Sequence, residues 1–160
     1  MIYLTEENAS QENMEQWLGQ LADPEFRLVK GSVLELLKPR LIACDYENRS
    51  AQFAFDVKEW QLNPEKGLHG GMMVTGFDVS FGLLSHYYAK QHMVSTININ
   101  TTFLKPVLPS DTIHFHVKMT LLGRTIYNMV GEAWLERDHI LAATASTSFM
   151  KLDKVFEAPI

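Results

Sequence analysis

The second half of the chain carries the clearest alternation of apolar and polar residues. In the segment TIHFHVKMTLL, residues 112–122, every second side chain is apolar. A strand points successive side chains to opposite faces, so the segment is predicted to be a half-buried strand. Its expected inward residues are Ile113, Phe115, Val117, Met119 and Leu121, and its expected outward residues are Thr112, His114, His116, Lys118 and Thr120.

Five other segments are strand-like. RLIACDY and AQFAFDV, joined by the polar ENRS, are predicted to form a hairpin. STININTTF (95–103), TIYNMVGEAWLE (125–136) and ILAATASTSFMKL (140–152) are predicted to be three more strands. In the first of these three, we expect Ile97, Ile99, Thr101 and Phe103 on one face and Thr96, Asn98, Asn100 and Thr102 on the other.

Helical spacing occurs near the N-terminus and in the middle of the chain. Residues 10–22 place Met14, Trp17, Leu18 and Leu21 at helical intervals behind Ser10, a suitable N-cap. A short second helix or turn is expected at 24–30. The main helix is expected from about 70 to 90, where apolar residues lie on every side, which is typical of a helix buried on most faces.

This order of elements predicts an α+β fold. Two strands, one long helix and four strands joined by short turns favour an antiparallel sheet of about six strands wrapped around the helix. A second copy of the protein would cover any face of the helix left open. We expect a single domain over residues 1–160, with a helical N-terminal extension (1–30), a core (31–152) and a tail (153–160).

One acidic residue, Asp78, interrupts the apolar helix. An unpaired buried carboxylate is strongly unfavourable, so Asp78 must reach hydrogen-bond donors, water or a ligand. The simplest partners are nearby hydroxyl groups, those of Thr75 and Ser80. The start of the same helix suggests a function, because Gly70 and Gly71 expose backbone N–H groups where the helix dipole favours negative charge. Such N–H groups are able to form an oxyanion hole.

Spacing separates these two features within one chain. Gly70 and Asp78 are eight residues apart, which is about 12 Å along a helix. If two such helices pack antiparallel across a two-fold axis, Asp78 of one chain approaches Gly70 of the other. We therefore expect a site shared between two chains.

Composition excludes several classes of function. The formal charge of −5 and the absence of a Lys/Arg run disfavour nucleic-acid binding. The single cysteine, Cys44, excludes an intrachain disulfide and a multi-cysteine metal cluster. The acidic N-terminus lacks the pattern of a signal peptide, and Asp78 and His86 interrupt the most apolar stretch, so no membrane span is expected. A cytoplasmic location is the expectation.

The residues around Asp78 resemble a known family. Asn63, His69-Gly70-Gly71 and Asp78, with TFLKPV and LLGR further on, resemble the hotdog-fold thioesterases of the phenylacetate-pathway type over roughly residues 35–152. The resemblance implies a hotdog fold and homodimers that often pair into tetramers. It also implies hydrolysis of acyl-coenzyme A without a metal or other cofactor.

The resemblance also implies a role for each residue. The Gly70 N–H would polarise the thioester carbonyl, supported by Asn63 and His69, and Asp78 of the partner chain would act as general base or nucleophile. Thr96 would help to place the attacking water. Further substrate contacts are expected from Gly71, Met72, Phe77 and Phe81, and from Lys105 and Arg124 toward the phosphates of coenzyme A.

Several alternatives remain open. Asn63 precedes Pro64, so it also fits a simple turn. His114 and His116 lie on one strand face, but no third ligand accompanies them, and we expect solvent-exposed residues rather than a metal site. A hotdog dehydratase or hydratase would carry its acid in a different context. A non-catalytic acyl-CoA-sensing domain would gain little from a buried carboxylate.

Overall fold

The structure, a computed structural model, describes residues 5–23, 25–26, 29–90 and 92–155. Its helices are α1 (Gln11–Ala22), α2 (Val33–Leu37), the 3-10 turn η1 (Glu59–Gln61) and α3 (Gly70–Ala89). Its strands are β1 (Arg40–Asp45), β2 (Ser50–Asp56), β3 (His92–Phe103), β4 (Thr112–Leu122), β5 (Ile126–Leu135) and β6 (Ile140–Val155).

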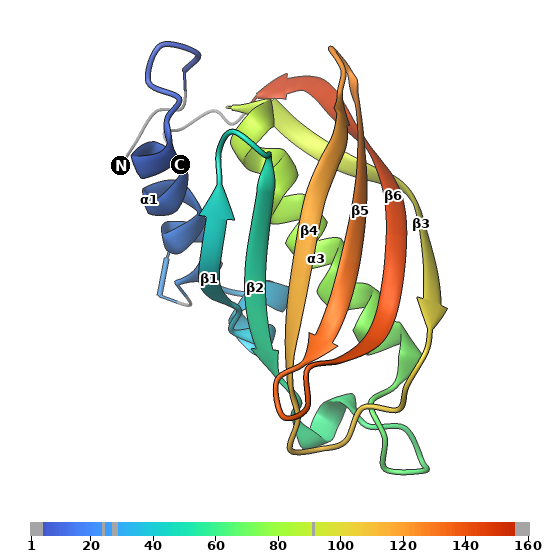
Figure 1. Ribbon diagram of the computed structural model, residues 1–160. Coiled ribbons are helices and arrows are strands. Elements are labelled where there is room, and N and C mark those ends of the chain that lie inside the picture. Colours follow the sequence, from blue (N-terminus) through green and yellow to red (C-terminus); the bar gives the residue numbers. More distant parts are fainter. Residues whose placement is uncertain (1–4, 24, 27–28, 91, 156–160) are drawn as a thin grey trace.

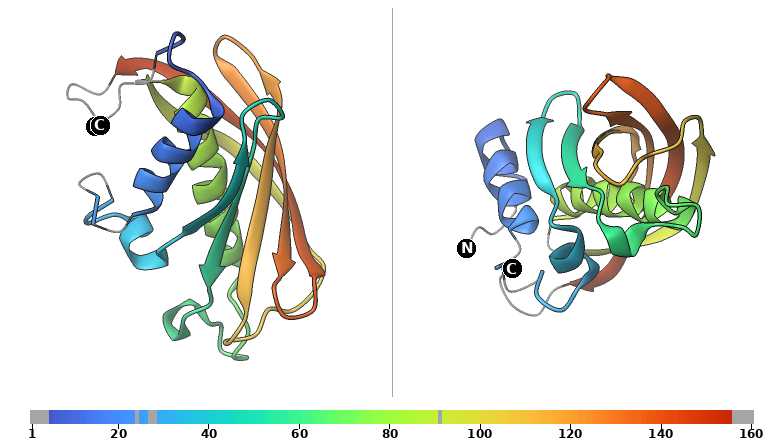
Figure 2. Two further views of the ribbon diagram at one scale, coloured as in Figure 1. Left: turned by 60° about the vertical axis from the view of Figure 1, so that its left-hand side comes forward. Right: turned by 90° about the horizontal axis from the view of Figure 1, so that it is seen from below.

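The six strands form one antiparallel sheet in the order β1-β2-β4-β5-β6-β3. The sheet curves around α3, which lies along its concave face (Figure 1), and the view from below shows the strands curling past the helix (Figure 2). This arrangement confirms the predicted α+β fold with a central helix. The strand order adds a feature that the sequence did not give, because β3 pairs with β6 at the edge and not with β4, which follows it in the chain.

Aromatic rings fill the space between α3 and the sheet. Phe77 and Phe81 of α3 are fully buried and stacked, and Phe115 of β4 meets the Phe77 ring edge-on at a centroid distance of 4.9 Å. Gly76 is required here, because a Cβ at this position would come within 2.8 Å of Phe115 Cε2. The group that comes close to the helix backbone at Gly76 is thus an aromatic ring of the same chain.

Two bulges change which side chains face the helix. The pairing of β3 with β6 shifts between Thr96 and Asn98, so that Thr96 lies opposite Phe149 and Ile99 lies opposite Thr147. Phe149 and Thr147 are both buried, so Thr96 and Ile99 face the helix together although three positions separate them. The expectation that Thr96 and Ile99 lie on opposite faces was therefore wrong, and Ile97, expected on the same face as Ile99, is 48% exposed.

The second bulge lies near the end of β4. The inward residues from Ile113 to Met119 are buried as predicted. The pairing with β5 then shifts between Met119 and Leu121. Leu121 is 50% exposed, and Leu122 takes its place against the core.

The N-terminal helix covers the β1 edge of the sheet. Ser10 caps α1 by accepting a hydrogen bond from the Asn13 N–H, and Met14, Trp17, Leu18 and Leu21 are buried, as predicted. The Gln11 side chain donates to the Cys44 carbonyl and accepts from the Tyr46 N–H, so it pairs with β1 as a strand would. The expected helix or turn at 24–30 lies partly outside the described residues, and the second helix, α2, occurs later.

No helix within the described ranges is long and apolar enough to cross a membrane.

Candidate active site

His69 organises the start of α3. As the N-cap it has extended backbone angles (φ −63°, ψ 134°), and its Nδ1 accepts a hydrogen bond from the Gly71 N–H at 2.9 Å. The His69 carbonyl accepts from the N–H groups of Met72 (2.8 Å) and Met73 (3.3 Å). The bond from Met73 is the first regular bond of the helix. Of the four N–H groups that a helix start leaves unpaired, His69 binds those of Gly71 and Met72, and its own N–H donates to the Gln61 carbonyl at 2.9 Å.

The fourth N–H group of this turn belongs to Gly70. Among the described residues it has no hydrogen-bond partner, and Gly70 lines an open cleft of about 510 Å³. The helix dipole adds partial positive charge at this position. Of the two glycines expected to donate, Gly71 is thus committed to His69, and Gly70 offers the free donor.

Asn63 shapes one wall of this cleft. Its Oδ1 accepts from the Gly67 N–H at 3.1 Å, and its backbone N–H donates to the Gly67 carbonyl at 2.8 Å. The side chain therefore closes a turn, as the Asn-Pro signal indicated, while it also lines the cleft beside Gly70.

Asp78 lies two turns further along α3. Its Oδ1 accepts a hydrogen bond from Thr96 Oγ1 at 2.7 Å. The nearby hydroxyl groups do not serve it, because Thr75 donates to the Gly71 carbonyl and Ser80 to the Gly76 carbonyl, each at 2.8 Å. The bulge in β3 is what turns the Thr96 hydroxyl toward this carboxylate.

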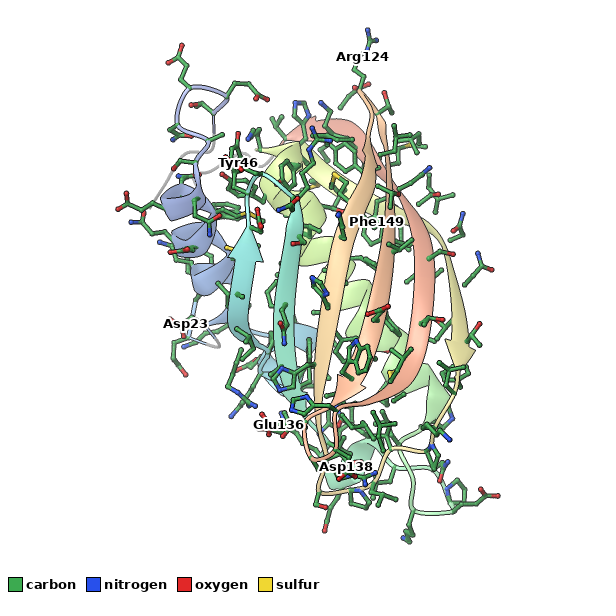
Figure 3. All side chains as sticks on the ribbon, viewed as in Figure 1. Asp23, Tyr46, Arg124, Glu136, Asp138 and Phe149 are labelled. Atoms are coloured by element: carbon green, nitrogen blue, oxygen red, sulfur yellow. The ribbon has the colours of Figure 1, made fainter. Side chains whose placement is uncertain are left out.

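The structure brings together only some of the other predicted substrate contacts. Lys105 lines the same cleft as Gly70. Arg124 lies at the tip of the β4–β5 hairpin, at the opposite end of the sheet from Asp138 in the β5–β6 turn (Figure 3). The loops that carry Asn63 and Lys105 lie at the Asp138 end (Figure 1), so within one chain Arg124 is remote from the cleft.

The expected apolar pocket differs from the one observed. Phe77 and Phe81 are 0% exposed and pack into the core of their own chain, so no cleft reaches them. Met72 packs toward Leu37 and Phe55, on another side of the helix. The apolar residues that line the cleft instead include Leu68, Met73, Phe103 and Leu104.

Sequence reasoning missed the residues that hold the cleft in shape. A Cβ on Gly70 would lie 3.4 Å from the Phe103 ring, so this ring already packs against the helix start. Asp111, 3% exposed, accepts from the Leu108 N–H and binds Arg137 Nε at 2.5 Å, which fixes the loop after β3. Asp111 falls in a Pro-Ser-Asp turn signal, but its pairing with Arg137 joins distant parts of the chain.

The remaining candidate chemistry is structural. Burial raises the pKa of the Cys44 thiol to about 11, which makes it a poor nucleophile. His116 is exposed as expected, whereas the His114 ring is only 18% exposed and lies between Gln52 and Glu136. In the part of the chain that the structure describes, no group of three or more metal-binding side chains comes together.

Comparison with known proteins shows which family and which structures this chain is similar to. Residues 66–142 match the family model of the thioesterase superfamily. A structure of a candidate thioesterase related to phenylacetic acid degradation from Ralstonia eutropha JMP134 is 26% identical, with 84% of this chain and 98% of that chain covered and a TM-score of 0.71.

Two more distant structures share the fold. The PaaI protein of the Escherichia coli phenylacetic acid degradation operon is 16% identical, with 86% of this chain and 98% of that one covered and a TM-score of 0.71. A Streptococcus mutans protein bound to acetyl-CoA is 19% identical over 74% of this chain and 91% of that one, with a TM-score of 0.65. No curated protein sequence matches the chain.

Proposed function

Since residues 66–142 place this chain in the thioesterase superfamily, we propose that it hydrolyses acyl-coenzyme A thioesters to the free acid and coenzyme A. The observation that carries this proposal is the Gly70 N–H, which has no hydrogen-bond partner among the described residues and belongs to the lining of the cleft at the start of α3. The Streptococcus mutans structure with bound acetyl-CoA supports the choice of substrate.

The reaction needs few groups. The Gly70 N–H would donate to the thioester oxygen and stabilise the negative charge that develops on it. Asp78 would take a proton from a water molecule, whose oxygen attacks the carbonyl carbon. The carbon–sulfur bond then breaks, and the thiolate leaves and takes up a proton. Thr96, bound to Asp78, would hold the carboxylate in position; direct attack by Asp78 on the carbonyl is the alternative.

Each site would use two chains. Gly70 and Asp78 are eight residues apart on a continuous helix, about 12 Å, too far to act on one carbonyl. The face of α3 that carries Gly71, Thr75 and Asp78 is exposed or only partly buried. Strand β3, at the edge of the sheet, leaves a 12-residue edge that another strand is able to extend. A homodimer that pairs two α3 helices antiparallel would complete two sites, and two dimers would form the expected tetramer.

Gly70→Pro tests the oxyanion donor. Proline is favoured at the first helical position, and the extended ψ of His69 suits a residue before proline. The substitution therefore removes one N–H with little effect on the fold. We expect kcat to fall about 10²–10³-fold, whereas the control Gly70→Ala, which keeps the N–H, loses far less. Equal losses in both variants would contradict the role of this donor.

Asp78→Asn tests the base, because the amide oxygen still accepts from Thr96 while the basic carboxylate is lost. We expect a fall of about 10²–10⁴-fold in the release of free thiol from acyl-CoA. Thr96→Val, which leaves the carboxylate in place, should have a smaller effect. Tight acyl-CoA binding without turnover by the wild-type protein would favour the acyl-CoA-sensing alternative.

Mixing the two inactive variants tests the shared site. In a dimer of one Asp78→Asn chain and one Gly70→Pro chain, one site combines an intact Gly70 with an intact Asp78. Random re-association of equal amounts should restore about a quarter of wild-type activity, since half of the dimers are mixed and each carries one active site of two. A mixture that stays inactive after verified subunit exchange would place both residues in the site of one chain.

A further inference from the structure

The loop between β3 and β4, residues 104–111, forms one wall of the cleft beside Gly70. Its residues in the lining are Leu104, Lys105, Pro106, Val107 and Leu108. The loop contains no helix or strand, and Pro106 and Pro109 give it two positions without a backbone N–H donor. Its shape therefore depends on a few specific contacts, because no regular hydrogen-bond ladder supports it.

The middle of this loop is joined to the segment that leads into α3. The Val107 carbonyl accepts a hydrogen bond from the Leu68 N–H at 2.9 Å, and Val107 is buried. A Cβ on Gly67 would lie 3.5 Å from the same carbonyl oxygen, so the two segments are in close contact. Leu68 is only two residues before Gly70. A displacement of Val107 would therefore move the backbone that carries the Gly70 N–H.

Asp111 fixes the end of the loop next to Val107. Its Oδ2 accepts from the Leu108 N–H at 2.7 Å, and its own N–H donates to the Leu108 carbonyl at 3.0 Å. The Asp111 carbonyl accepts from the Val57 N–H at 3.0 Å, just after the end of β2. The second carboxylate oxygen, Oδ1, lies 2.5 Å from Arg137 Nε. One side chain thus joins the cleft loop to the turn between β5 and β6.

The two partners of this ion pair differ in burial. The Asp111 side chain is 1% exposed, whereas the Arg137 side chain is 43% exposed. A buried carboxylate is costly unless it is paired and hydrogen-bonded, and apolar residues often replace a buried ion pair without loss of stability. In several proteins, buried polar groups instead specify one arrangement of the chain. Here the arrangement is that of the loops around Gly70.

We propose that the Asp111–Arg137 pair is a positioning element for the hydrolysis, which holds the Gly70 N–H where the thioester oxygen binds. Neither partner lines the cleft, so both act through Val107 and the segment before α3. The turn that carries Arg137, marked by Asp138 in Figure 3, lies at the same end of the sheet as the cleft loops. The inference rests on the proposed thioesterase function and adds two positioning residues that the sequence pattern did not indicate.

Asp111→Asn tests the pair, because the remaining side-chain oxygen still accepts from the Leu108 N–H while the ion pair is lost. Asp138→Asn is the matched control, since it removes the same charge from the other carboxylate bound to Arg137, which is 51% exposed. We expect Asp111→Asn to lower kcat about 10-fold, less than the 10²-fold loss that a displacement of about 1 Å is able to cause. Asp138→Asn should leave kcat unchanged, since an exposed ion pair contributes little.

A double-mutant cycle shows whether this loss acts through the oxyanion donor. Gly70→Pro removes the N–H that Asp111 is proposed to position. Adding Asp111→Asn to Gly70→Pro should therefore lower kcat no further, although each change alone lowers it. Losses that multiply in the double variant would show that Asp111 acts by another route. That result, or wild-type kcat in Asp111→Asn, overturns the inference while thioester hydrolysis stands.

Amide hydrogen exchange measured by NMR adds a readout that needs no turnover. The Leu68 N–H binds the Val107 carbonyl, so we expect it to exchange about 10-fold faster in Asp111→Asn, relative to the amides of β4, and at an unchanged rate in Asp138→Asn. Unchanged exchange in Asp111→Asn overturns the inference whatever the activity. If Leu68 responds as expected but the wild-type protein hydrolyses no thioester, the coupling between the loops stands, and the proposed function is refuted together with the catalytic role of the pair.

Discussion

Replacing Gly76 by alanine tests the packing that sets the position of α3. The added Cβ would lie 2.8 Å from Phe115 Cε2 and closer still to Cζ, whereas ordinary contact begins at 3.4 Å. The Phe115 ring has little room to move, because the rings of Phe55 and Phe77 meet it edge-on at centroid distances of 5.2 and 4.9 Å. Overpacking of this kind costs about 1–3 kcal/mol.

Helix propensity acts in the opposite direction and needs a control. Alanine is better than glycine by about 1 kcal/mol in a helix interior. Gly19 in α1 is exposed, and a Cβ there would meet nothing within 4 Å. Gly19→Ala should therefore stabilise the protein by about 1 kcal/mol. Gly76→Ala should be less stable than Gly19→Ala by about 1–3 kcal/mol, the cost of the clash alone.

Urea unfolding at one fixed protein concentration measures both variants, since association makes stability depend on concentration. Adding Phe115→Leu to Gly76→Ala should recover part of the loss, because the two positions are coupled. If Gly76→Ala proves as stable as Gly19→Ala, the contact between Gly76 and Phe115 does not set the distance between α3 and the sheet.

Two further predictions concern histidines of α3 and its cap. His69→Asn should keep both the free energy of unfolding and kcat close to wild type, since asparagine is a good N-cap. His69→Ala should lower the free energy of unfolding by about 1 kcal/mol and also lower kcat. Equal losses of kcat in both variants would show that the ring itself acts in the reaction. Burial lowers the pKa of His86 to about 4, while an unfolded imidazole binds its proton near pH 6.5. As the pH falls from about 6.5 toward 4, the unfolded state binds a proton that the folded state does not, so the free energy of unfolding decreases, by about 2 kcal/mol at pH 5. Urea midpoints between pH 7 and 5 should fall more steeply in wild type than in His86→Gln, and parallel curves would contradict the assignment.

Local signals were sufficient for α1, α3 and most strands, but not for α2, which occurs after the expected segment 24–30. The start of α3 follows from His69-Gly70-Gly71, and α1 follows from Ser10 and four apolar residues at helical spacing. These features depend on neighbours in the chain, so the sequence displays them. The antiparallel sheet followed from the short turns between strands.

Features that depend on distant partners were not predictable in this way. The bulge that turns Thr96 toward Asp78 arises from the pairing of β3 with β6, which alternation alone does not reveal. The pattern marked Phe77 and Phe81 as buried, but it does not tell whether a ligand or the same chain covers them. Arg124 was chosen for its charge, and only the fold shows that the hairpin carries it to the other end of the sheet.

The contact between Gln11 and β1 bears on self-association. A sheet edge with free peptide groups is a template for another chain, and the Gln11 amide occupies the Cys44 carbonyl and the Tyr46 N–H at this edge. Shortening the protein to residues 31–152, the predicted core, would expose β1 together with the apolar surface beneath α1. The shortened protein would then carry two open edges instead of one, and end-to-end polymers would compete with closed dimers.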